Sequence, residues 1–168
     1  MRLFPCIEIK EFRNCEHGDF ITTEISGNIS SGLCINDEDD KRRFLILSSA
    51  DAVNTYKVVN HSKTDTVMSY GKDWILTVSG APMSSPNALR SAGNLVHTSE
   101  GPFLIGMTMQ NGGYEEPMFC KLDGPGAWLN IFDASPRFAF QDWKIQILDQ
   151  TLTQSYELAT RVTRRQKK

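Results

Sequence analysis

Short runs of β-branched and aromatic residues, each closed by a turn signal, recur along almost the whole chain. Such runs suit the pleated, half-buried surface of a β-sheet. Their close spacing leaves no room for repeated strand–helix–strand units, so a parallel sheet is disfavoured. The runs therefore predict an all-β protein of about ten strands. They cover residues 3–10, 20–25, 43–48, 53–59, 64–70, 74–78, 103–109, 118–122, 128–132 and 138–148.

The breaks between the runs contain residues that form tight turns. Asn111-Gly112-Gly113 separates two strand-like runs, and Asn and Gly accept the positive φ angles of a hairpin. Tyr70-Gly71-Lys72-Asp73 and Asp123-Gly124-Pro125-Gly126 are similar breaks. Strands at short intervals are typical of two antiparallel architectures. The sequence predicts an antiparallel β-sandwich or a jelly-roll-like barrel.

A β-trefoil is a minor alternative, because three segments share an aromatic residue followed by aliphatic ones. They are Phe44-Leu45-Ile46, Trp74-Ile75-Leu76 and Trp143-Lys144-Ile145. A trefoil would repeat such segments at one period. The aromatic residues are 30 and 69 positions apart, so an even period fails.

Residues 80–100 are small, polar and rich in turn formers. We expect a long surface loop here, with one helical turn after Pro86. Long loops without regular structure are uncommon and often functional. This segment is therefore a candidate recognition loop.

The C-terminal part has a different pattern of apolar residues. Leu152, Tyr156, Ala159 and Val162 recur at spacings of four, three and three, which predicts a short helix. Thr151 could cap it. The Thr and Val content favours the alternative, a final strand.

The length of 168 residues fits one domain, which we place at residues 1–160. Residues 161–168 form a basic tail. Without its five cations the chain has 13 basic and 20 acidic residues, a net charge of −7 for 1–160. Nucleic acid is therefore expected to bind only through the tail, if at all, and a disordered solubilising tail is the alternative. The tail cations are Arg161, Arg164, Arg165, Lys167 and Lys168.

The chain contains no run of the roughly 20 apolar residues that span a membrane as a helix. Its first residues lack the apolar stretch of a signal peptide. We expect a soluble or cytoplasmic protein with no membrane span. In that setting Cys6, Cys15, Cys34 and Cys120 should be reduced thiols.

Asp37-Glu38-Asp39-Asp40 is the sharpest local cluster of charge. Carboxylates from one loop can bind Ca²⁺, with Asp37, Asp39 and Asp40 as the candidate ligands. The spaced pattern of a calcium loop is absent, and Lys41-Arg42-Arg43 follows at once. We expect a solvated turn, with Ca²⁺ as the alternative and no other cofactor.

Two other groups of residues could bind zinc or catalyse hydrolysis. Cys15-Glu16-His17 with Asp19 could bind zinc only if distant cysteines converged on it. His61 lies near Asp65 in the sequence, but no nucleophile motif such as Gly-x-Ser-x-Gly accompanies it. Catalytic triads form in space, so a hydrolase stays open as a third hypothesis. The balance is against an enzyme.

The aromatic residues offer the most direct route to ligand binding. Trp74, Trp128 and Trp143 lie inside strand-like runs and are expected mainly in the core. A sandwich can also place one aromatic residue at a rim with polar groups beside it. The candidate ligand-binding residues are Trp128, Asn130 and Asp133, with Tyr114 at a hairpin tip.

These patterns favour non-catalytic recognition of a carbohydrate or protein partner through loops. The alternative is a structural subunit of a larger assembly, such as a capsid or tail-like particle, and a homo-oligomer fits either hypothesis. Fold class alone does not separate them, since sandwiches host many functions.

Overall fold

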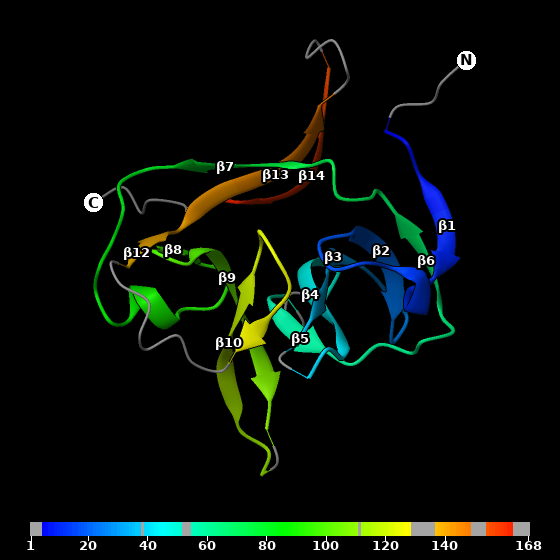
Figure 1. Ribbon diagram of the computed structural model, residues 1–168, viewed down its shortest axis with the longest axis horizontal. Coiled ribbons are helices and arrows are strands. Elements are labelled where there is room, and N and C mark those ends of the chain that lie inside the picture. The colour runs from blue at the N-terminus through cyan, green and yellow to red at the C-terminus, as the bar shows by residue number, and fades with distance from the viewer. Residues whose placement is uncertain are drawn as a thin grey trace.

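Two β-sheets carry nearly all of the regular structure (Figure 1). The computed structural model describes residues 5–37, 39–51, 55–110, 112–128, 137–148 and 154–162. Two 3₁₀ turns, η1 (Phe12–Asn14) and η3 (Ala88–Arg90), accompany the strands. The strands are β1 (Glu8–Glu11), β2 (Phe20–Ile25), β3 (Asn28–Asn36), β4 (Arg42–Ser49), β5 (Lys57–Val59), β6 (Thr66–Ser69), β7 (Ile75–Ser79), β8 (Leu95–Thr98), β9 (Gly101–Met109), β10 (Glu115–Lys121), β11 (Ala127–Trp128), β12 (Phe138–Phe140), β13 (Asp142–Leu148) and β14 (Ser155–Arg161).

The larger sheet has the order β1-β6-β2-β3-β4-β5-β9-β10-β11, and β8 and β12 branch from β9. The smaller sheet has the order β14-β13-β7 and runs across the top of the view in Figure 1. The described strands pair antiparallel except for β5 and β9, which are parallel. The predicted all-β, sandwich-like class is confirmed. The strand order does not confirm a jelly roll, and it lacks the threefold repetition of a trefoil.

The described part of the chain has 14 strands, more than the ten or so predicted. β3 and β8 were missed, residues 138–148 form two strands instead of one, and β14 was predicted as a helix. β3 contains Asn, Ser and Gly, which weaken a strand signal. Its place is secured by pairing with β2 on one side and β4 on the other. At Gly32 the register with β4 shifts, and a Cβ there would overlap the carbonyl of Leu45. Glycine is therefore required by the close approach of two backbones.

Buried side chains lie on both faces of the central strands. Leu45 and Leu47 of β4 belong to a cluster that includes Trp143 and Ile145 of the smaller sheet. Phe44 and Ile46 of the same strand face a second cluster on the other side. Burial on both faces explains why consecutive residues within 43–48 are apolar, whereas a strand buried on one face alternates apolar and polar residues.

Residues 80–100 are only partly the loop that we expected. The helical turn after Pro86 is present as η3. The segment from Leu95 to Thr98 is instead strand β8, paired with β9 and β12. The predicted hairpin around residues 111–113 is confirmed by β9 and β10, and Gly112 and Gly113 have φ angles of 121° and 80°.

The C-terminal helix prediction was wrong, and the alternative of a final strand is confirmed. Ala159 pairs with Ile145 and Tyr156 pairs with Ile147, with a bulge between them. The bulge adds one residue to β14, so residues three apart lie on the same face. This offset accounts for the spacing of three between Tyr156 and Ala159. Val162 is 71% exposed beyond the end of β14, and Thr151 and Leu152 lie outside the described residues.

Arg161 also differs from its predicted place in the tail. It is the last residue of β14 and pairs with Trp143. Its guanidinium lies 5.2 Å from the centre of the Tyr56 ring and donates a hydrogen bond to Asn94 Oδ1. Burial lowers the pKa of Arg161. The other four tail cations, Arg164, Arg165, Lys167 and Lys168, lie outside the described residues.

Candidate ligand-binding cleft

A cleft of about 600 Å³ opens where three loops meet. Residues 15–19 lead from η1 to β2, residues 70–74 join β6 to β7, and residues 122–126 join β10 to β11. The last two loops contain turns that the sequence indicated, but their meeting depends on sheet order. The cleft is lined by Glu16, His17, Gly18, Lys72, Trp74, Leu122, Asp123, Gly124 and Pro125.

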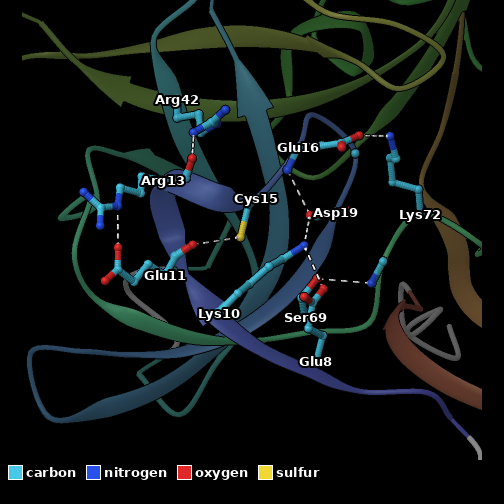
Figure 2. Close-up of polar contacts among 12 residues, drawn as sticks. Glu8, Lys10, Glu11, Arg13, Cys15, Glu16, Asp19, Arg42, Ser69 and Lys72 are labelled. Carbon is cyan, nitrogen blue, oxygen red and sulfur yellow. Dashed lines mark hydrogen bonds and ion pairs between the residues drawn. The ribbon is translucent and has the colours of Figure 1, made fainter.

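Asp19 organises the first loop. Its side chain is almost fully buried, and Oδ2 accepts hydrogen bonds from Lys10 Nζ at 2.8 Å and from the backbone N–H of Glu16 at 2.9 Å (Figure 2). Burial by itself lowers the pKa of Lys10, but the hydrogen bond and charge of Asp19 outweigh it and raise that pKa. The ion pair therefore ties β1 to the loop that carries His17.

His17 is a structural link in the cleft wall. Its Nδ1 accepts the backbone N–H of Asn36 at 3.0 Å, so Nε2 carries the proton and donates to the carbonyl of Lys121 at 3.0 Å. Burial lowers the pKa of His17. A neutral imidazole with both nitrogens engaged joins the end of β3 to the end of β10. It has no free nitrogen for a metal ion or for proton transfer.

Trp74 forms the aromatic wall. Its indole Nε1 donates to the carbonyl of Gly18 at 2.8 Å, and its backbone N–H donates to the carbonyl of Lys72 at 2.9 Å. The side chain is half-buried and packs against the core between the sheets. The ring therefore has one fixed orientation, with part of its surface lining the cleft. Trp74 was expected mainly in the core, and its contact with the core is observed, but it was not among the predicted ligand-binding residues.

Two charged groups face each other at the cleft. Lys72 and Glu16 form an ion pair (Figure 2). The hydrogen bond and charge of Lys72 lower the pKa of Glu16, and those of Glu16 raise the pKa of Lys72. Both side chains are exposed, so the pair is weak and can open for a ligand.

Asp123 supplies a second carboxylate to the cleft. Its side chain is 50% exposed, with Oδ1 3.7 Å from Lys121 Nζ. It lies against Gly101, whose φ angle is 114°, and a Cβ at that position would overlap the carboxylate. Asp123 thus lies against Gly101 and has acceptor capacity to spare.

Two of the four predicted ligand-binding residues, Trp128 and Tyr114, lie in the described part of the chain, and these two are apart from each other. Trp128 is half-buried and packs edge-on against Phe103, with ring centres 5.9 Å apart. Tyr114 is exposed beyond the other end of β10. Trp128 pairs with Phe119, and Tyr114 lies five positions before Phe119 in the chain. Five positions correspond to about 17 Å of extended strand. Asn130 and Asp133 lie outside the described residues.

Three acids of the turn at residues 37–40, Asp37, Asp39 and Asp40, have protein groups as partners, and Glu38 lies outside the described residues. Asp37 Oδ1 accepts the backbone N–H groups of Asp39 and Lys41, and Oδ2 accepts Arg43 Nε at 2.9 Å. Burial alone would raise the pKa of Asp37, but these hydrogen bonds and the Arg43 charge hold it below its usual value. Asp40 Oδ1 accepts a hydrogen bond from Asn36.

In the part of the chain that the structure describes, no three His, Cys, Asp or Glu side chains gather as a metal site. Asp39 pairs with Lys41 at 2.7 Å. Asp37, Asp39 and Asp40 each have a protein partner, and calcium binding stays a prediction.

The four cysteines are free thiols. Cys15 and Cys34 are buried, and burial raises the pKa of Cys15 to about 11 and that of Cys34 to about 12. Burial also raises the pKa of Cys120. Protonated thiols are poor nucleophiles and poor zinc ligands. Only Cys6 is exposed.

His61 and Asp65 meet a hydroxyl group in space. His61 Nε2 lies 3.2 Å from Thr23 Oγ1, and Nδ1 lies 3.6 Å from Asp65 Oδ2. The arrangement resembles a catalytic triad in outline. However, Thr23 is 6% exposed and His61 packs edge-on against Phe12. The hydroxyl is not open to a substrate, so we assign no hydrolysis to this group.

Comparison of the chain with protein-family models, with curated proteins and with solved structures found no match. No helix in the described ranges is long and apolar enough to cross a membrane. The candidate function therefore rests on the geometry of the cleft alone.

Proposed function

We propose that the protein is a non-catalytic recognition module that binds a carbohydrate in the cleft beside Trp74. The proposal rests on one observation: the indole of Trp74 is held in one orientation next to Lys72, Glu16 and Asp123. Ligand sites are usually concave, with an aromatic surface and a few polar groups that set orientation. The volume of about 600 Å³ falls in the range of small-ligand sites.

The chemistry of the walls fits a neutral, polyhydroxylated ligand. The face of an indole carries partial negative charge, which attracts the weakly positive C–H groups on one side of a sugar ring. Carboxylates of Asp123 and Glu16 can accept hydrogen bonds from sugar hydroxyls, and Lys72 can donate to ring or hydroxyl oxygens. The ligand would replace the exposed ion pair between Lys72 and Glu16 with hydrogen bonds to both partners.

The fixed cleft also favours a small ligand over a protein partner. Asp19, His17 and Trp74 all anchor the loop at residues 15–19 through hydrogen bonds. A preorganised site loses little conformational entropy on binding. The alternative is a protein partner that binds the same cleft residues through the three loops.

The test is titration of the full chain with a panel of neutral mono- and oligosaccharides, followed by calorimetry and tryptophan fluorescence. We expect saturable binding by at least one sugar class. Asp123→Asn should weaken that binding about tenfold or more, because it replaces a charged hydrogen-bond acceptor. Trp74→Phe should weaken it while keeping an aromatic ring in place.

Glu115→Gln is the matched control. This exposed acid pairs with Lys57 and lies at the opposite end of β10 from Lys121. The control should bind as the native chain does. Equal sugar affinity in the Asp123→Asn chain, or no response to any sugar in the panel, contradicts the proposal.

A further inference from the structure

β7 is an edge strand with unusual composition. It pairs only with β13, so within the described ranges its other edge has no strand partner. Its sequence, Ile-Leu-Thr-Val-Ser, contains no charge and no proline. Ile75 is 43% exposed and Val78 is 45% exposed. Natural proteins usually protect an exposed edge with charges, proline, a bulge or a cover, because it can pair with another chain.

The other described edges are protected in these ways. β1 carries Glu8, Lys10 and Glu11. β14 carries Glu157 and a bulge in its pairing with β13. β11 has only two residues, and β12 is bridged on its free side by Met83. β7 is the longest uncharged edge in the described part of the chain.

We propose that β7 pairs antiparallel with β7 of a second copy of this chain, around a twofold axis at Thr77. In this register Leu76 lies opposite the partner's Val78, and Ile75 lies opposite the partner's Ser79. The two Thr77 residues face each other. Aliphatic and Thr–Thr pairs directly across antiparallel strands are favourable.

The faces of the strand agree with this pairing. Leu76 and Val78 lie opposite Ile145 and Trp143 of β13, on the side that faces the larger sheet. Thr77 lies opposite Lys144, on the outer side. Self-pairing therefore joins apolar residues on the inner face and neutral residues on the outer face, with no charge brought against a like charge.

The product is a continuous six-stranded sheet with the order β14-β13-β7-β7-β13-β14. The same patch is used by both copies, which is the usual symmetry of a dimer. A second copy is the occupant we infer, because pairing about Thr77 sets Leu76 against an aliphatic residue and brings no charge against a like charge. The dimer does not depend on the proposed sugar binding, so oligomeric state and ligand affinity test separate ideas.

The first test is sedimentation of the full chain over a concentration series. We expect a reversible dimer at twice the chain mass of 18.9 kDa. Thr77→Lys would set two like charges directly opposite each other and should weaken the dimer about tenfold or more. Thr77→Val keeps a β-branched side chain and should leave the dimer intact.

The second test fixes the register by cross-linking. In a Cys6→Ser background, Thr77→Cys should be joined between copies by a short bis-maleimide, because facing Cβ atoms lie about 4.5–5.5 Å apart. Ser79→Cys should not be joined, since the two copies of residue 79 lie at opposite ends of the paired strands. A chain that is monomeric at all concentrations, or a dimer that is insensitive to Thr77→Lys, overturns the proposal. Cross-linking at residue 79 but not at residue 77 also overturns it.

Discussion

At the scale of single residues, buried polar groups define the local geometry of the cleft. Asp19 illustrates this, since its Oδ2 accepts hydrogen bonds from both Lys10 Nζ and the backbone N–H of Glu16. A buried acceptor of this kind is costly to alter, because its donors are left without partners. The sequence shows an aspartate near a turn, but the partner, Lys10, is found only in the folded chain.

We predict that Asp19→Asn lowers the free energy of unfolding by about 2 kcal/mol, because a charged hydrogen bond to Lys10 is replaced by a neutral one. Urea denaturation measures the change. Glu8→Gln is the matched control, since Glu8 approaches the same lysine at 3.4 Å but its side chain is 69% exposed. Its effect should stay below about 0.5 kcal/mol. Equal losses in the two variants would show that the burial of Asp19 does not matter.

His61 provides a pH dependence. Burial lowers the pKa of His61, although the charge of Asp65 partly opposes this. The neutral form stabilises the fold above the ordinary histidine pKa of about 6.5. As the pH falls below that value, the unfolded chain takes up a proton first, and stability is lost until the folded pKa is reached.

We therefore expect the free energy of unfolding of the native chain to fall as the pH drops below about 6.5. His61→Gln should reduce the slope, and His17 should account for part of the remainder, because burial lowers its pKa as well. His97, which is exposed on β8, is the control position. A slope that His61→Gln leaves unchanged would contradict this assignment.

At the scale of elements, pairing with neighbours decides which segments become strands. β3 contains weak strand formers but lies between β2 and β4. β14 contains Tyr156 and Ala159 at helix-like spacing, yet a bulge in its pairing with β13 accounts for that interval. In both cases the long-range partner outweighs the local preference of the chain.

Gly32 tests this view at one position. We predict that Gly32→Ala destabilises the protein by about 1–3 kcal/mol, because its Cβ would overlap the Leu45 carbonyl where β3 and β4 approach. Thermal unfolding measures the loss. Gly124→Ala is the control, since a Cβ there meets no atom within 4 Å. A Gly32 variant as stable as the control would mean that the two strands can separate without cost.

At the scale of the whole molecule, the layers explain where the cleft and the free edge lie. The larger sheet is buried on both faces around β4, and the smaller sheet covers one of them. The smaller sheet leaves β7 at its border, directly after Trp74 of the cleft. The proposed sugar site and the proposed dimer edge are therefore neighbours along the chain with separate surfaces.

The sequence by itself determined the all-β class, most strand positions and the hairpin at residues 111–113. Those features depend on local residue preferences, because β-branched runs and Asn-Gly turns act within a few positions. It did not indicate the cleft: Trp128 lies on β11 and Tyr114 lies directly before β10, at the far end of that strand, whereas Trp74, Lys72 and Asp123 lie around one cleft.

Only the tertiary structure decided that convergence, together with the strand identity of β3, β8 and β14. The physical reason is that sheet order joins segments distant in sequence. His17 and Lys121, for example, are 104 residues apart and share a hydrogen bond. No local pattern records which strands become neighbours, so a cleft built from three loops appears only when the sheets have assembled.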